Sequence, residues 1–155
     1  MKKVEKPDSG MSAQEMQWQK SVAAEKDLRA LLDRDYSAGL MNNTKWSELA
    51  TAFFGLRLMF TIQFVDVKEP LTAGGFQSVP PRHWDSAVGP FLTLSIEWLE
   101  IDPIRYDPPL GHLLKPRQTD CTAEVEALLQ QIGIPYHLQN GHFRITGHLR
   151  NNAQK

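Results

Sequence analysis

This sequence has only one cysteine, no long apolar run and no excess of charge of either sign. Its single cysteine, Cys121, rules out an intramolecular disulfide and a cysteine-based zinc knuckle. No run approaches the roughly 18 apolar residues that a membrane-spanning helix needs, and the start, MKKVEKPDSGMSAQ, lacks the apolar core of a secretory signal. The net charge of -1 gives no electrostatic reason to expect nucleic acid or an anionic membrane as the partner. We therefore expect a cytoplasmic protein.

The 155 residues, 41% of them hydrophobic, are enough for one sizeable core and too few for two. Residues 1–10 are charged and have nothing to bury, so they are predicted to be a disordered tail. Residues 11–36 should form an N-terminal helix, because Ser12 and Glu15 have the spacing of a capping box and Glu25 precedes Arg29 by four positions. This helix either docks on the core or meets a partner. Residues 37–150 should form the domain, with 151–155 as a second tail.

Residues 39–67, GLMNNTKWSELATAFFGLRLMFTIQFVDV, predict a helix that leads into a strand. Asn43 or Thr44 can cap the helix, and its apolar residues share one face at i, i+3, i+4 and i+7. Gly55 ends it, and from Leu56 the apolar residues alternate with polar ones, as in a half-buried strand. The predicted core residues are Trp46, Leu49, Ala50, Phe53, Leu56, Leu58, Phe60, Ile62 and Phe64.

The second half of the chain predicts a strand at residues 91–101, a helix from Asp120 to Gly133, and a hairpin at residues 134–149. Asn140-Gly141 favours a type I′ turn, because both residues tolerate positive φ. This turn sets Leu138 opposite Phe143 and His137 opposite Arg144. The predicted core residues are Leu92, Leu94, Ile96, Trp98, Val125, Leu128, Leu129, Ile132, Ile134, Tyr136, Leu138, Phe143, Ile145 and Leu149.

Two proline-rich stretches, residues 66–90 and 102–117, lack periodicity and are predicted to be loops, with a short strand near His83-Trp84. The predicted fold class is α+β. Two α-β-β units would form a four-stranded, mainly antiparallel sheet with helices on one face, plus the N-terminal accessory helix. The opposite face of the sheet would then be partly open to solvent.

That open face and the loop at its edge form the candidate binding site, since binding usually resides on such loops and clefts. Thr93 and Ser95 should also lie on it. Trp98 is predicted to be a core residue, and Trp84, among prolines, an exposed contact residue. The competing interpretation is a solvated face without function. The candidate residues are Thr61, Gln63, Trp84, Glu97, His137, His142, Arg144 and His148.

Catalytic and metal sites have weaker support in the sequence. Glu97 and Glu100 fall on opposite faces of one predicted strand, and no HExxH or comparable ligand spacing is present. His142 and His148 are six residues apart, about 20 Å along a strand, which is too far to share a metal ion. No pattern calls for a cofactor. The residues therefore favour a binding protein over an enzyme.

Three short motifs carry a resemblance to a known family. They are GLMNNTKW at residues 39–46, IEWLEI at 96–101 and GIPY at 133–136. Together they resemble a family of small bacterial proteins of unknown function, over roughly Tyr36 to Leu149. The resemblance implies a bacterial origin and the extent of the domain, but no catalytic residues.

We expect the chain to bind another protein, with a homo-oligomer as the other option. One specific hypothesis is an immunity-type protein that neutralises a bacterial toxin; small α+β chains without catalytic motifs suit such work, although this is an analogy at the level of the fold. The alternative is a small-molecule-binding protein or an enzyme that uses a His/Glu/Arg cluster on the open face.

Overall fold

A computed structural model describes residues 13–87, 89–109, 111 and 115–151. Within them the chain is α+β, with three α-helices and twelve strands in several antiparallel sheets. It divides into two units, residues 1–35 and 36–155. The first contains α1 (Ala13–Asp35), on which the predicted Glu25–Arg29 pair is confirmed at 3.0 Å. The predicted tail at residues 1–10, the capping residue Ser12 and residues 152–155 lie outside the described residues.

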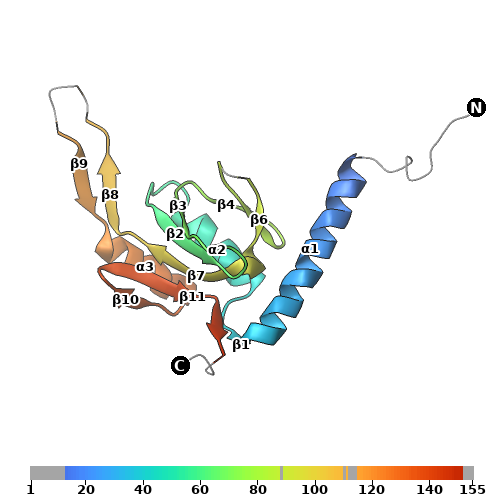
Figure 1. Cartoon of the computed structure of the whole chain (residues 1–155). Helices are drawn as coiled ribbons and strands as arrows, with labels where there is room; N and C mark the ends of the chain where they lie inside the picture. The colour runs from blue at the N-terminus through green and yellow to red at the C-terminus, as the bar shows by residue number, and fades with distance from the viewer. Residues whose placement is uncertain (1–12, 88, 110, 112–114, 152–155) are drawn as a thin grey trace, which may run out of the picture. The chain divides into compact units, whose positions relative to one another are not determined.

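The second unit is built on a five-stranded sheet in the order β10-β11-β7-β2-β3 (Figure 1). The predicted four-stranded arrangement of two units was therefore wrong, because the supposed loop at residues 66–90 supplies β3 as a fifth strand. Its strands are β2 (Phe60–Phe64), β3 (Leu71–Ala73), β7 (Ile96–Ile101), β10 (His137–Gln139) and β11 (His142–Thr146).

Three smaller sheets surround this one. They are β1 (Tyr36–Gly39) with β12 (His148–Arg150), β4 (Gln77–Val79) with β5 (His83–Asp85) and β6 (Phe91–Leu92), and β8 (Ile104–Asp107) with β9 (Arg117–Asp120). The strand predicted near His83-Trp84 is confirmed. The two predicted loops were otherwise only partly right, because prolines such as Pro80-Pro81 lie in turns between short strands that the absence of periodicity concealed.

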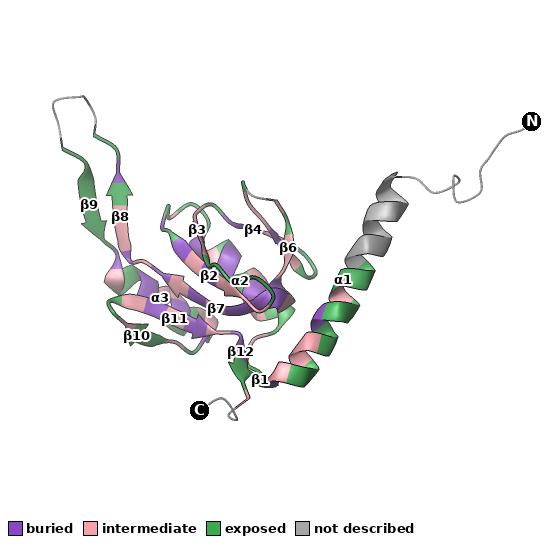
Figure 2. Cartoon of the chain, in the orientation of Figure 1, coloured by how far each residue is buried: buried purple, intermediate pink, exposed green. Residues whose placement is uncertain are grey.

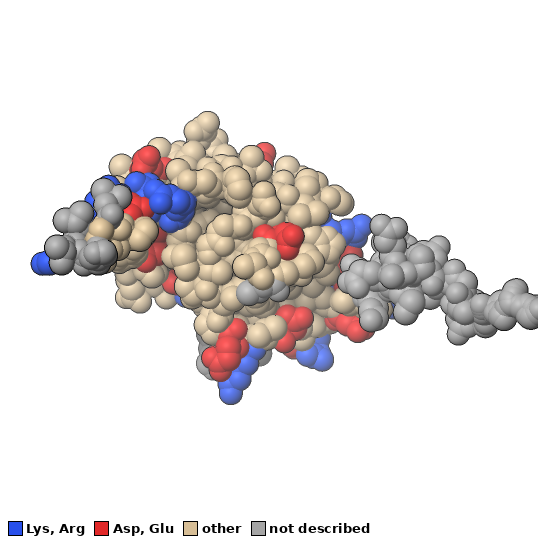
Figure 3. All heavy atoms as spheres, turned by 90° about the horizontal axis from the view of Figure 1, so that it is seen from above, with Lys and Arg blue, Asp and Glu red and all other residues tan. Residues whose placement is uncertain are grey.

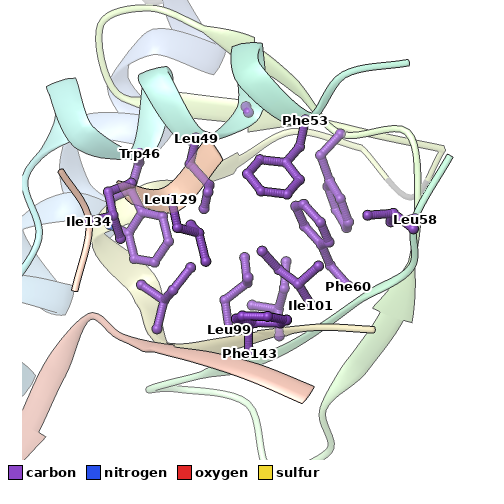
Figure 4. Packing of buried hydrophobic residues seen from close by; sticks show 14 of the residues in the cluster. Trp46, Leu49, Phe53, Leu58, Phe60, Leu99, Ile101, Leu129, Ile134 and Phe143 are labelled. Carbon is purple, nitrogen blue, oxygen red and sulfur yellow. The ribbon is translucent and has the colours of Figure 1, made fainter. Parts of the chain in front are cut away.

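Helices α2 (Asn43–Phe53) and α3 (Thr122–Ile132) cover one face of the large sheet and enclose the core with it (Figures 2 and 4). The predicted face of α2 is confirmed, since Trp46, Leu49, Ala50 and Phe53 are all buried. The cap of α2 differs from the predicted Asn43 or Thr44, because the side chain of Asn42 accepts from the Lys45 amide. At α3, Cys121 occupies the cap position without a side-chain hydrogen bond, and the predicted Asp120 accepts from the Thr122 amide at 2.9 Å.

Strand β7 departs most from the predicted alternation. It begins at Ile96, after a 3₁₀ turn at Thr93–Ser95, and contains a bulge: Gln63 of β2 pairs with Trp98, but Phe64 pairs with Ile96. The residue between them, Glu97, is the extra one. Leu99 and Ile101 consequently join Ile96 in the core, and the predicted core residue Trp98 faces the opposite side.

The predicted hairpin turn is confirmed, with φ of 55° at Asn140 and 81° at Gly141, and so is the pairing of Leu138 with Phe143. The predicted core face was only partly right. Phe143 is buried, but Leu138 is 62% exposed because β10 is an edge strand that lacks a neighbour on its outer side. Leu149 is also exposed, because it belongs to β12 in a different sheet.

The bulge explains why residue 147 is a glycine. A Cβ atom built on Gly147 would lie 2.3 Å from the Ile96 carbonyl oxygen and 3.1 Å from the Trp46 ring. Gly147→Ala should therefore destabilise the protein by about 1–3 kcal/mol or more, since both neighbours must move. Chemical denaturation would measure this, with Gly111→Ala as the control, because Gly111 has open space around it. Equal stability of the two variants would contradict the bulge geometry.

Candidate functional site

The face of the large sheet away from α2 and α3 is here called the open face. Arg144 of β11 lies opposite Glu100 of β7, which lies opposite Thr61 of β2, so the three side chains form one row across the sheet. Thr146, Trp98 and Gln63 form the next row. With His142, these are the side chains that define the open face.

Arg144 is the centre of this surface. Its guanidinium carbon lies 3.8 Å from the centre of the Trp98 ring, and its Nη2 and Nε atoms lie 2.6 and 2.8 Å from Glu100 Oε2. Stacking and charge-assisted hydrogen bonds therefore hold the same group. The exposed fractions of the Arg144 and Glu100 side chains are only 21% and 14%, so this pair is much better shielded than a surface salt bridge. The result is a rigid patch rather than a mobile charge.

His142 lies beside this pair but is poorly arranged for catalysis. Its Nδ1 atom is 3.5 Å from Glu100 Oε1, and its Nε2 atom is 3.9 Å from Asp102 Oδ1. Both ring nitrogens thus face carboxylates, which leaves neither directed at a substrate position, as a general base requires. Nowhere in the described part of the chain do three or more His, Cys, Asp or Glu side chains gather as a metal ion would need.

A cleft of about 260 Å³ opens at the end of the open face where β10 begins. Its walls are mainly apolar, and Arg144 and Thr146 connect it to the open face. Tyr136 is held in place by its hydroxyl, which donates to Glu126 on α3 at 2.9 Å. Desolvation and this hydrogen bond raise the pKa of Tyr136 above its ordinary value. The cleft is lined by Leu40, Met41, Pro135, Tyr136, His137, Arg144 and Thr146.

Comparison with known proteins places the chain in a family. A model of a family of unknown function, DUF6678, matches residues 28–152. The chain belongs to DUF6678. The match includes every residue of the open face and of the cleft, and it extends beyond the predicted limits of Tyr36 and Leu149 at both ends. That the GLMNNTKW motif is characteristic of the family, and that the protein is bacterial, stay predictions.

No curated protein and no solved structure matches this DUF6678 chain. Among its described helices, none is long and apolar enough to cross a membrane.

The GLMNNTKW stretch of this DUF6678 chain has mostly structural roles. Asn42 caps α2, and Lys45 Nζ donates to the carbonyl oxygen of Ile132 at 2.6 Å, at the negative end of the α3 dipole. Leu40 and Met41 are different, because they form one wall of the cleft. The stretch thus fixes the two helices to each other and contributes directly to the candidate site.

Five predicted site residues lie on or beside this surface. Thr61, His142 and Arg144 belong to the open face, and His137 lines the cleft. Gln63 also points to the open face, but its Nε2 atom donates to backbone carbonyls, including that of Val67 at 2.7 Å. Its amide therefore holds the turn after β2 instead of facing a ligand.

The other three predicted residues are buried elsewhere, so the prediction of an exposed Trp84 in the loop, and of Glu97 and His148 on the open face, was wrong. Trp84 is fully buried and its Nε1 atom donates to the Trp46 carbonyl oxygen at 3.1 Å. Glu97 leaves the face because of the bulge, and His148 belongs to β12. Thr93 and Ser95 are also buried, in the 3₁₀ turn.

Glu97 instead anchors the β1–β12 pair. Its Oε1 atom accepts from the Tyr36 hydroxyl at 2.9 Å and from Arg150 Nη2 at 3.0 Å, and its Oε2 atom accepts from Arg150 Nε at 2.9 Å. His148 packs edge-on against Tyr36 at 5.9 Å, and its Nε2 atom is 2.7 Å from the Leu94 carbonyl oxygen. This cluster is structural.

Sequence reasoning missed Trp98, Glu100, Leu40 and Met41. For Trp98 and Glu100 the obstacle was the bulge, which reverses the face that a strict alternation assigns to each residue after it. Opposite charges on Glu100 and Arg144 were the one signal that could have paired them. The cleft residues Leu40 and Met41 gave no signal, because they lie between a strand and a helix.

Because Glu97 is buried, mutating it should lower the stability of the protein. Glu97→Gln should lower the free energy of unfolding by about 1–3 kcal/mol, because the hydrogen bonds to Tyr36 and Arg150 lose the carboxylate charge. Glu48→Gln is a matched control: Glu48 pairs with Lys45 but its side chain is 45% exposed, so the change should stay below about 1 kcal/mol. Similar urea midpoints for both variants would show that the cluster contributes little.

His148 should make stability depend on pH. Burial lowers its pKa below the ordinary 6.5, against smaller opposing effects of the Leu94 carbonyl and Glu97. Below pH 6.5 the unfolded chain therefore binds more protons than the folded chain, so stability falls with the pH. The contribution of His148 to the free energy of unfolding is complete above that pH and is lost below it. The fall in melting temperature from about pH 7.5 to about pH 5.5 should shrink in His148→Gln and persist in His137→Gln, where the ring is exposed. An unchanged fall in His148→Gln would refute this assignment.

Proposed function

We propose that this DUF6678 chain is a protein-binding module, and that the cleft receives an apolar side chain of the partner. The observation that carries the proposal is the position of the Arg144–Trp98–Glu100 group beside an apolar cleft. Arginine, tryptophan and tyrosine are the residues most enriched where binding energy concentrates in interfaces. Here they are held rigid by contacts within the chain, so little conformational entropy is lost on binding.

The charges of the cleft favour a partner side chain over a charged small molecule. They are already satisfied, because Arg144 is paired with Glu100. A ligand that needed a free cation would have to displace that carboxylate.

A catalytic role for the open face is the less favoured alternative. His142 faces carboxylates with both ring nitrogens, and Glu100 is paired with Arg144. These side chains satisfy one another, whereas an acid or base must be within reach of substrate. The arrangement supports binding better than proton transfer.

An immunity-type protein that neutralises a bacterial toxin is one specific form of the proposal. In that form the partner is a protein whose expression stops growth, and co-expression of this chain restores it. Restored growth that is lost in a cleft variant would support this form. If co-expression of this chain fails to restore growth with any captured partner, the toxin form is rejected and the general binding proposal remains.

The partner can be found by photo-crosslinking in cells. A photoreactive phenylalanine at Leu40, which lines the cleft and is 51% exposed, should yield a discrete adduct with another protein. The same group at Tyr106, which is 56% exposed on β8, is the matched control and should not. An adduct with a second copy of this chain would identify a homo-oligomer. Identical adduct patterns at both positions would contradict the cleft as the binding site.

Filling the cleft should then abolish binding. Thr146→Trp places a large side chain in the cleft and should weaken the captured partner at least tenfold, measured by calorimetry. Thr72→Trp is the matched control: Thr72 is exposed on β3, at the other edge of the same sheet, and its variant should bind normally. Circular dichroism checks that both variants fold. Unchanged affinity of a folded Thr146→Trp would sink the proposal.

A further inference from the structure

A second cavity, of about 240 Å³, lies at the C-terminal end of α2 and shares no residue with the cleft or the open face. Its walls include the buried side chains of Phe53, Leu58, Phe60 and Phe76. The Phe60 and Phe76 rings are stacked, with centres 5.6 Å apart and planes at 15°. Figure 4 shows Phe53 reaching down from α2 towards Phe60, with Leu58 beside them. The interior of this cavity suits an apolar group.

One charged residue, Arg57, lines this apolar cavity. It occupies the left-handed region with φ of 60°, a conformation that is strained for any residue with a side chain. Gly55, two residues earlier, also has positive φ and would tolerate it freely. The turn therefore holds an arginine where a glycine would be less strained. Such strain points to a role for the side chain, which is 63% exposed at the cavity.

The guanidinium of Arg57 is only partly engaged. Its Nη1 atom is 2.8 Å from Asp107 Oδ1, but the contact lacks hydrogen-bond geometry, and that buried oxygen has no hydrogen-bond partner among the described residues. Asp107 is the acceptor group nearest to this guanidinium, and the other N–H groups of Arg57 have no acceptor among the described residues. They are available to a second acceptor at the mouth of the cavity.

The local charge also favours an anion. Asp107 is the only carboxylate that pairs with Arg57 in the described part of the chain, and it pairs with Arg105 as well, whose Nε atom is 3.4 Å from Asp107 Oδ2. One negative charge thus faces two positive charges. Figure 3 shows blue and red side chains side by side near the β8–β9 hairpin, next to a largely uncharged surface. A carboxylate at Arg57 would balance the remaining positive charge.

We propose that this cavity binds a small organic acid, with its apolar body among the phenylalanines and its carboxylate on Arg57. A neutral apolar ligand would leave the guanidinium without the added acceptor. A cationic one would be repelled. The volume limits the ligand to a short chain or a single ring. This site is independent of the proposed partner cleft, so each proposal can fail alone.

The test uses octanoate, with 1-octanol and octylamine as matched neutral and cationic probes, and measures binding to the full chain by calorimetry and NMR. Octanoate should bind 1:1, at least tenfold tighter than octanol, and octylamine should not bind. Arg57→Gly removes the guanidinium while accommodating the positive φ, so it should remove the preference for octanoate over octanol. Arg82→Gln, which removes an exposed arginine in the turn between β4 and β5, should leave octanoate binding unchanged.

A second variant tests the location. Ala50→Leu fills the cavity from α2 and should remove binding of both octanoate and octanol. If this variant does not fold, nuclear Overhauser contacts between octanoate and the Phe60 and Phe76 rings locate the site in the unaltered chain, and their absence overturns it. The proposal is also overturned if octanoate fails to bind at millimolar concentration, if octanol binds equally well, or if Arg57→Gly keeps the preference. If a peptide with a free C-terminal leucine bound more tightly than octanoate, the ligand would be the C-terminus of a protein and the proposal of a small organic acid would be overturned.

Discussion

The bulge at Glu97 is the constraint on which the rest of the second unit depends. β7 is the central strand of the large sheet, so a shift of one residue within it affects both faces. Ile96 and Leu99 both reach the core because Glu97 stands between them as an extra residue. Trp98 and Glu100 then face the other way and create the open face. The same displacement brings the backbone of residues 96–97 against Gly147, where a side chain would not fit.

The two carboxylates of β7 act on different parts of the second unit. Glu97 pairs with Arg150 and so fixes β12 and β1 to the sheet, whereas Glu100 pairs with Arg144 and stiffens the open face. Each carboxylate is largely shielded from water and has its own arginine, which offsets the cost of burial. One strand therefore supplies both the anchor of the terminal segments and the rigid part of the candidate site.

Features that depend on sequence neighbours could be predicted. The buried face of α2 follows from the spacing of Trp46, Leu49 and Phe53, and the hairpin follows from Asn140-Gly141. Features set by tertiary contacts could not. The bulge in β7 has no compositional signature, so Trp98 was predicted to be in the core but lies on the surface. Trp84 was predicted to be exposed but lies in the core. The short strands among the prolines were missed for a similar reason, since three-residue strands are too short to show a period.

The cleft depends on the same anchor, although its walls come from distant parts of the chain. Leu40 directly follows β1, and its amide donates to the Gly147 carbonyl oxygen at 2.8 Å, next to the bulge. Tyr36 at the start of β1 is held by Glu97 of β7, and Gly147, which holds Leu40, donates its own amide to the Glu97 carbonyl oxygen. The segment that carries Leu40 is therefore fixed to β7 at both of its ends. Arg144 on the opposite wall is tied to β7 through Glu100. Both walls of the cleft are therefore held in place by contacts that lead to β7. A site built from remote segments can in this way keep a fixed shape before any partner binds.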